Sequence, residues 1–315
     1  MKLSIVATLF ESAPFIGEFC DRASAAAESL VGPSFEIVLV NDGSTDDSLQ
    51  QALLLQKRSE HLRVVDLTRN FGHHPAMLCG LAQSRGDRVF LIDSDLEEDP
   101  ALLTFFWERL DACPDVDVVY GVQAARKGGL FERWSGSFFY KTFNALSDVP
   151  IPSNFLTVRL MSRRYVDELV RYDERVMQFS VLSELAGYKK VEVQVDKRDK
   201  GSSAYTMGKK LAHLTDAITS TSIKPLIWMF KLGLLITLAS MSYSGWVIFK
   251  ALTGVSAVDG WASLIVSVWF LGGVIMMSLG IVGIYMAKIF LEVKKRPNFA
   301  VKSVHEPGTS RDFNR

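Results

Sequence analysis

Short apolar runs alternate with longer mixed spacers over the first 123 residues of the chain. Five of these runs are rich in β-branched residues and read LSIVATL, FEIVLVND, LRVVDLT, RVFLIDSD and VDVVYGV. Such runs, separated by spacers long enough for a helix, are typical of a mostly parallel sheet with helices on both faces. The pattern therefore predicts an α/β domain, which we extend over residues 1–225.

Two much longer apolar runs follow this domain. The chain carries no charge from Leu232 to Phe249, nor from Trp261 to Ala287. Each run is long enough for a helix to cross about 30 Å of hydrocarbon. We therefore predict two transmembrane helices at about 226–250 and 261–288, with a pair of buried core helices as the alternative.

Charges around this hydrophobic region, residues 226–290, predict its orientation. Lysine and arginine flank the region, whereas the loop between the two runs has almost no positive charge. The positive-inside rule then places the α/β domain and both chain ends in the cytoplasm, in a multi-pass protein of the inner (plasma) membrane. We expect residues 291–315 to form a loose polar tail.

Two further segments, at about 129–147 and 206–224, are expected to be helices lying in the membrane interface. The first is aromatic and basic at helical spacing, and an ordinary helix packed on the sheet is the alternative.

Composition limits the function. The 35 basic residues balance the 35 acidic ones, so no global field attracts nucleic acid and we expect no such partner. The three cysteines, Cys20, Cys79 and Cys113, lack metal-ligand spacing and are interpreted as core thiols in a reducing compartment. Any electrostatic function must be local, and an assembly of identical subunits stays open.

Three polar clusters follow predicted strands: VNDGSTD after the second, RNFGHH after the third and DSDLEED after the fourth. The carboxyl ends of parallel strands meet at one edge of the sheet, where ligands of such folds bind. We therefore expect the clusters to form one shared site.

The acidic cluster has the chemistry of a metal site. Asp93 and Asp95 are alternate residues after a buried run, so their carboxylates share one side of the chain. Such hard oxygen ligands suit Mg²⁺ or Mn²⁺, which substrate phosphates and water usually complete. We interpret Glu98 and Asp99 as helix-start residues.

The polar clusters VNDGSTD and RNFGHH are interpreted as substrate-binding loops and not as metal sites. Asp42 is placed to accept hydrogen bonds from a nucleobase or a ribose, whereas Gly43–Asp46 is interpreted as a strand-to-helix connection with a cap. His73 and His74 are not assigned to a metal, because adjacent histidines in a glycine turn cannot easily share one ion.

These motifs, together with RLMSRRYVDEL, KGSSAYTMGKKL and the terminal hydrophobic pair, resemble the polyprenyl-phosphate glycosyltransferases. These are membrane-anchored members of glycosyltransferase family two, of the dolichol-phosphate mannose synthase and bactoprenol glucosyltransferase type. The resemblance implies a GT-A-like (Rossmann-like) domain followed by a two-helix transmembrane hairpin. It also implies inverting, metal-dependent transfer of a sugar from a nucleotide-sugar donor, a UDP-sugar first, to undecaprenyl phosphate at the cytoplasmic membrane face.

The resemblance assigns roles by position. It implies nucleotide-sugar contacts at Thr8, Phe10, Glu11, Asp42, Arg69, Asn70, Gly72 and Asp93. It implies catalytic roles for Asp93 and Asp95, which with Glu97 would hold the metal.

The acceptor phosphate needs cations and small donors, because guanidinium and ammonium groups match phosphate oxygens. The candidates are Arg159, Arg163, Arg164, Arg198, Lys200, Ser202, Ser203 and Tyr205.

Two positions depart from the family pattern. The first strand reads VATLFE where the family commonly has VPVYNE, which affects the assignment of Thr8 more than that of Glu11. Thr157 stands near the place of an Asp often proposed as the catalytic base, and a hydroxyl cannot be a general base at neutral pH. A phosphate monoester has its second pKa at about 6, so the acceptor is mostly a dianion at pH 7 and needs no base.

Two alternative functions remain at this stage. One is a transferase that extends a lipid-linked saccharide or a polymer, although a hydroxyl acceptor would require a base. The other is a catalytically silent membrane protein that binds a nucleotide, and the Asp93 and Asp95 pair argues against it.

Overall fold

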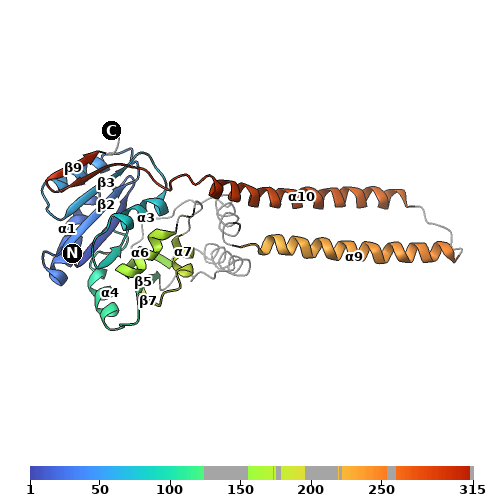
Figure 1. The fold of residues 1–315 in the computed structure, drawn as a ribbon, viewed down its shortest axis with the longest axis horizontal. Coiled ribbons are helices and arrows are strands. Elements are labelled where there is room, and N and C mark those ends of the chain that lie inside the picture. Colours follow the sequence, from blue (N-terminus) through green and yellow to red (C-terminus); the bar gives the residue numbers. More distant parts are fainter. Residues whose placement is uncertain are drawn as a thin grey trace. The chain divides into compact units, whose positions relative to one another are not determined.

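The computed structural model describes residues 1–123, 155–172, 174, 179–195, 219, 222–253 and 260–312. The chain divides into two compact units (Figure 1). The first contains residues 1–140, 150–205 and 296–315, and the second contains residues 141–149 and 206–295. The expected interfacial helix at 129–147, and nearly all of the one at 206–224, lie outside the described residues.

The first unit is built on one sheet with the strand order β7-β5-β6-β4-β1-β2-β3-β8-β9. Adjacent strands β4, β1, β2 and β3 are parallel, as are β5 and β7, whereas β6 runs antiparallel to both of its neighbours. The predicted mostly parallel α/β sheet is therefore confirmed. The strands are β1 Leu3–Leu9, β2 Phe35–Asn41, β3 Leu62–Leu67, β4 Arg88–Leu91, β5 Val118–Gln123, β6 Phe155–Ser162, β7 Lys190–Val195, β8 Val301–Glu306 and β9 Thr309–Asp312.

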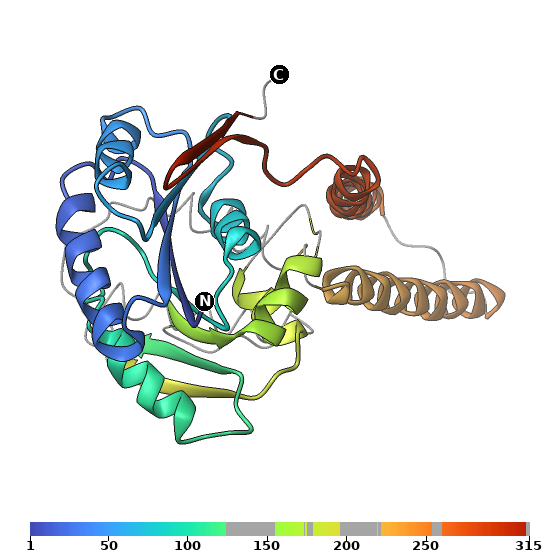
Figure 2. The ribbon, with the colours of Figure 1, turned by 60° about the vertical axis from the view of Figure 1, so that its left-hand side comes forward.

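Helices cover both faces of this sheet (Figure 2). One core layer packs α1, α2 and α4 against the sheet, and the other packs α3, α6 and α7. The central strands β1, β2 and β3 are buried at every position, which explains why their sequences are mostly apolar. The helices are α1 Ile16–Val31, α2 Ser48–Gln56, α3 His73–Gln83, α4 Leu102–Asp111, α6 Arg163–Arg171 and α7 Phe179–Leu185.

Helix α3 lies very close to the sheet because of one glycine. A Cβ added at Gly80 would collide with the side chains of Val6 and Val40, on β1 and β2. This close approach fixes the start of α3 at the end of the central strands, where the candidate site lies.

The C-terminal segment is not loose. Its strands β8 and β9 form a hairpin, and β8 pairs antiparallel with β3, with Val65 opposite Val304. The expectation of a loose polar tail is therefore wrong for residues 301–312. The physical reason is that β3 would otherwise be an edge strand with unpaired backbone groups, and the tail satisfies them.

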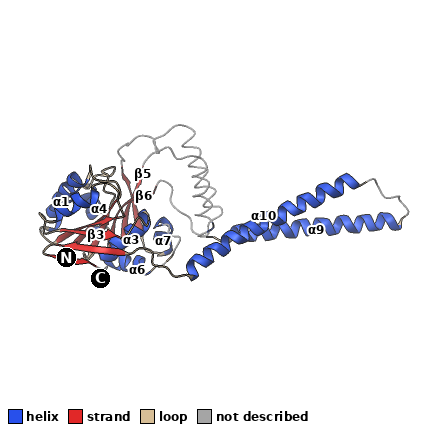
Figure 3. Cartoon of the chain, turned by 90° about the horizontal axis from the view of Figure 1, so that it is seen from above, coloured by secondary structure: helices blue, strands red, loops and turns tan. Residues whose placement is uncertain are grey.

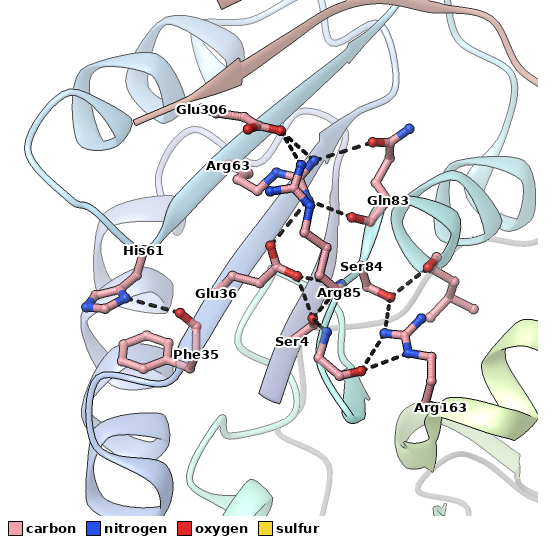
Figure 4. A network of polar contacts seen from close by, with 12 residues as sticks. Ser4, Phe35, Glu36, His61, Arg63, Gln83, Ser84, Arg85, Arg163 and Glu306 are labelled. Carbon is pink, nitrogen blue, oxygen red and sulfur yellow. Dashed lines mark hydrogen bonds and ion pairs between the residues drawn. The ribbon is translucent and has the colours of Figure 1, made fainter. Parts of the chain in front are cut away.

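Glu306 at the end of β8 enters a charged network at the amino end of the central strands (Figure 4). Arg63 Nη2 lies 2.9 Å from Glu306 Oε1, and Arg63 Nη1 lies 3.2 Å from Glu36 Oε2. Arg85 Nη2 also reaches Glu306 Oε1, at 2.8 Å. Partial burial raises the pKa of Glu306, but Arg63 and Arg85 outweigh it and lower that pKa.

The second unit contains two long helices, α9 at Lys224–Leu252 and α10 at Trp261–Val293 (Figure 3). Within the part of the chain that the structure describes, one segment, Ser267–Val293 in α10, is long and apolar enough to cross a membrane. None of it is buried in the protein.

Candidate active site

The three polar clusters lie at one end of the strands, as the sequence predicts. At this end of the sheet the carboxyl ends of β4, β1, β2 and β3 lie side by side. Side chains connect the loops that follow these strands. The loop after β2 contacts the loop after β3, and that loop contacts β1 and the loop after β4.

Asp42 holds the loop after β3. Its carboxylate accepts the backbone N–H groups of Phe71 (2.7 Å) and Gly72 (2.9 Å), and the residue is only 3% exposed. Burial raises the pKa of Asp42, and these two hydrogen bonds partly oppose the rise. An added Cβ at Gly43 would collide with the backbone of Arg69 and Asn70, so the two loops touch directly. Asp42 therefore has a clear internal role, and its contact with a nucleotide stays a prediction.

The loop after β1 is tied to the start of α2. Thr45 Oγ1 donates to Glu11 Oε1 at 3.2 Å, and Asp46 accepts the backbone N–H groups of Ala13 and Ser48. These bonds agree with the interpretation of Gly43–Asp46 as a strand-to-helix connection. Phe10, in the same loop, leaves about half of its surface exposed at 48%.

The acidic cluster alternates in burial. Asp93, Asp95 and Glu97 are half-buried, whereas the residues between them are buried. Ser94 explains this alternation, because its Oγ donates to the carbonyl oxygen of Thr8 at 2.7 Å and fixes the chain against β1. Asp93 and Asp95 are thus each more accessible than the residues beside them, and their shared role in binding a metal stays a prediction.

A divalent ion fits this pair through the chemistry of its donors. Two carboxylates are hard oxygen ligands, and Mg²⁺ in such sites usually keeps water and phosphate ligands. Among the described residues no three His, Cys, Asp or Glu side chains come together as a metal site. The structure therefore does not bring Glu97 to Asp93 and Asp95, and Asp95 Oδ1 instead accepts the backbone N–H of Glu97 at 3.1 Å.

The two histidines at the start of α3 differ. His73 Nδ1 lies 3.2 Å from Thr8 Oγ1, and His73 Nε2 lies 3.4 Å from Asp93 Oδ1. His74 is largely buried, and burial lowers its pKa to about 4, so its ring is neutral at physiological pH. Its Nδ1 has no hydrogen-bond partner.

Arg159 lies inside the protein, not on a surface that meets a lipid. It is 1% exposed, its Nε and Nη2 donate to the carbonyl oxygens of Thr157 and Leu156, and its guanidinium lies over the rings of Phe155 and Phe179. Burial lowers its pKa to about 10, and Tyr165 and Asp93 oppose that effect. Its Nη1 has no hydrogen-bond partner, and its assignment to the acceptor stays a prediction.

Arg163 lies at the opposite end of the strands, near the start of β4. Ser162, the residue before it, pairs with Arg88 at the start of β4, whereas Asp93 follows the end of β4. Arg163 Nε donates to the carbonyl oxygen of Gly86 at 2.8 Å, and Nη2 donates to Ser84 Oγ at 3.1 Å (Figure 4). Its assignment to the acceptor is not supported.

Arg164 lies at that same end of the strands, where its guanidinium donates hydrogen bonds to the carboxylate of Asp117. The other acceptor candidates, Arg198, Lys200, Ser202, Ser203 and Tyr205, lie outside the described residues. They follow β7, which runs parallel to β5 and ends at Val195. Because β6 is antiparallel to both β5 and β4, the carboxyl end of β7 lies at the same edge of the sheet as Asp93.

Comparison with known proteins identifies the family. Residues 4–170 match the family model described as Glycosyl transferase family 2, which is more than half of the chain. The chain belongs to glycosyl transferase family 2.

Two relatives in this family extend the similarity beyond the matched residues. A protein of Mycobacterium tuberculosis (strain CDC 1551 / Oshkosh), named provisionally as a glycosyltransferase, is 45% identical over 305 residues, which cover 97% of this chain and 89% of the relative. The SfII prophage-derived bactoprenol glucosyl transferase of Shigella flexneri is 35% identical over 313 residues, which cover 97% of this chain and 99% of the relative.

One solved structure shares the fold. Glucosyl-3-phosphoglycerate synthase from Mycobacterium tuberculosis, in complex with Mn²⁺, uridine diphosphate and phosphoglyceric acid, is similar with a TM-score of 0.50 and 18% identity. The match covers 70% of this chain and 76% of that one. The family 2 chain is thus a glycosyltransferase with a GT-A-like sheet domain, as predicted.

Two residues at this site have a role that the sequence pattern did not predict. Ser94 lies between the two aspartates and anchors them, and a hydroxyl between alternating carboxylates is a signal that could have identified it. His73 was considered only as a metal ligand. Its position after the glycine that begins α3 was the available signal for a contact with the neighbouring strands.

Proposed function

We propose that this enzyme transfers a sugar from a nucleotide-sugar donor to a polyprenyl phosphate, such as undecaprenyl phosphate, at the cytoplasmic face of the plasma membrane. The product is a polyprenyl-phosphate monosaccharide that serves cell-envelope glycan or lipid modification. One observation carries the proposal: the similarity to a bactoprenol glucosyl transferase extends over 97% of this chain, far beyond the catalytic match at residues 4–170. It therefore includes the two long helices.

The chemistry of the acceptor agrees with the residues present. Thr157 replaces the carboxylate that a hydroxyl acceptor would need, and its carbonyl oxygen accepts from Arg159. A phosphate monoester is mostly a dianion at pH 7, since its second pKa is about 6, and it can attack the anomeric carbon without a base. This argues for a lipid phosphate over the extension of a saccharide chain.

Asp93 and Asp95 would hold Mg²⁺ or Mn²⁺ in this proposal. The ion would neutralise charge on the leaving nucleoside diphosphate. The glucosyl-3-phosphoglycerate synthase with the similar fold was solved with Mn²⁺ and uridine diphosphate, which makes a UDP-sugar the first donor to test. Thr8, Phe10, Glu11, Arg69 and the other nucleotide candidates belong to loops at this edge.

The acceptor phosphate is assigned to the segment after β7. Since Arg159 is buried and Arg163 donates to Gly86 at the opposite end of the strands, we assign this role to Arg198 and Lys200, with Ser202, Ser203 and Tyr205. The segment leaves β7 at the edge of the sheet where Asp93 lies.

The proposal predicts a membrane hairpin with both ends in the cytoplasm. In intact cells a Ser256→Cys variant, between the two helices, should react with a membrane-impermeant maleimide. A Lys57→Cys variant, exposed in the α/β unit, should react only after the cells are permeabilised. Reaction of the Lys57→Cys variant in intact cells would contradict the orientation.

A lipid product is the decisive test of the function. Membranes containing the full chain, supplied with labelled UDP-sugars and undecaprenyl phosphate, should form a charged lipid monosaccharide that mild acid releases. Membranes without the added lipid phosphate should form much less. Label that enters only a longer lipid-linked saccharide would support the extending transferase instead, and no transfer with any donor would support the silent nucleotide-binding protein.

A further inference from the structure

His73 connects two strands of the candidate site. It is the first residue of α3, and its ring reaches Thr8 at the end of β1 and Asp93 after β4. The distances are 3.2 Å from Nδ1 to Thr8 Oγ1 and 3.4 Å from Nε2 to Asp93 Oδ1. The ring thus lies against Thr8 and Asp93, two residues that the family resemblance assigns to the donor site.

Thr8 and Asp93 contact different nitrogens of the ring. Nδ1 lies within hydrogen-bond distance of Thr8 Oγ1, whereas Nε2 contacts Asp93 Oδ1 at 3.4 Å without hydrogen-bond geometry. A histidine held in this way sets the orientation of a ligating carboxylate, which is the usual task of groups just outside the ligands of a metal.

The backbone around His73 is fixed by its neighbours. Gly72 has φ of +100°, a conformation that other residues rarely adopt, and its N–H donates to Asp42. Gly80 brings α3 close to β1. The backbone position of His73 therefore follows from the loop and the helix, and its side chain is 44% exposed.

We propose that His73 is a positioning residue of the transferase: it holds Oδ1 of Asp93 so that the other carboxylate oxygen is presented to the divalent ion of the donor, and Thr8 fixes its ring. This rests on the proposed function, because it assumes that Asp93 binds a metal with a nucleotide. It also gives a role to Thr8, which departs from the family pattern in VATLFE.

Two substitutions separate the contacts of His73. The amide nitrogen of a glutamine reaches approximately the place of Nε2, whereas that of an asparagine reaches only the place of Nδ1. His73→Gln should therefore keep the contact with Asp93, and His73→Asn should lose it. The affinity of the full-length protein for Mn²⁺ in the presence of UDP, measured from the electron paramagnetic resonance signal of free Mn²⁺, reports the difference without any turnover.

We expect His73→Asn to weaken Mn²⁺ binding by about 10- to 100-fold, as is usual when an outer-shell partner is lost, and His73→Gln to stay within a few-fold of wild type. Thr8→Val should weaken it less, and adding Thr8→Val to His73→Asn should have little further effect. Thermal unfolding of each variant checks that the fold is kept.

Several results would overturn the inference. Equal Mn²⁺ affinities for wild type and His73→Asn would show that the contact does not position Asp93. Equal losses in the Gln and Asn variants would point to packing of the ring, and additive losses with Thr8→Val would refute the coupling. If the wild-type protein itself bound no Mn²⁺ with UDP, the proposed function would fail along with this inference.

Discussion

Asp95→Asn should abolish sugar transfer while the protein still folds and inserts. The substitution removes one of the two carboxylates that face the accessible side of the acidic cluster. Charge stabilisation by a bound metal is worth several kcal/mol, and each 1.4 kcal/mol is tenfold in rate, so we expect a loss on the order of 1,000-fold. The rate of formation of the labelled lipid in membranes containing the full chain measures this loss.

Asp99→Asn is the matched control, in the same acidic run. Asp99 forms an ion pair with Arg22 at 3.0 Å, and both side chains are about one-third exposed. Pairs of this kind contribute only about 0–1 kcal/mol, so this variant should keep most of its activity. Full activity of wild type after exhaustive chelation, or a slow rate in both variants alike, would contradict a metal role for Asp95.

The parallel core of the fold could be predicted from the sequence. LSIVATL forms β1, and the next runs form β2 and β3, because strands buried on both faces need mostly apolar side chains. The pairing of the tail could not be predicted in this way. β8 pairs with β3, so residues as far apart as Val65 and Val304 are partners, and a local pattern does not identify a distant partner.

The candidate site, too, could be predicted from the sequence only in part. Parallel topology brings the ends of β1, β2, β3 and β4 together, so the shared position of Asp42 and Asp93 follows from the pattern alone. For a strand of unknown direction the pattern does not tell which end faces the site. Arg159 and Arg163 are separated by four extended steps of about 3.3 Å each, or roughly 13 Å, and their guanidinium groups have different partners: the carbonyl oxygens of Thr157 and Leu156 for Arg159, and that of Gly86 for Arg163.

The burial of individual side chains also could not be predicted from the sequence. Arg159 carries a charge, and charged residues are seldom fully buried, so an exposed position was the natural expectation. The structure instead surrounds its guanidinium with two aromatic rings and two backbone carbonyl groups. Such an environment depends on residues from β6 and α7 together, and it cannot be derived from the RLMSRR segment alone.

Arg63→Met should strongly destabilise the first unit. The side chains of Arg63 and Glu36 are only 5% and 3% exposed, and the Arg63 guanidinium also contacts Glu306 of the C-terminal hairpin. Removing one partner of a buried ion pair typically costs about 3–5 kcal/mol, because the remaining charge stays buried without its counter-ion. Proteolysis of the full chain in detergent micelles at increasing urea concentration measures the loss of unfolding free energy.

Arg85→Met provides the control, because it removes a second guanidinium from the same glutamate. The Arg85 side chain is 56% exposed, so solvent screens its contact with Glu306 and we expect a loss of about 0–1 kcal/mol. The Arg63 variant should also release the C-terminal hairpin, because Glu306 loses its buried partner, and a cleavage site within residues 301–312 should become accessible at lower urea than in the control. If the two variants lost the same unfolding free energy, this would contradict the idea that Arg63 links the C-terminal hairpin to the buried carboxylate of Glu36 on β2.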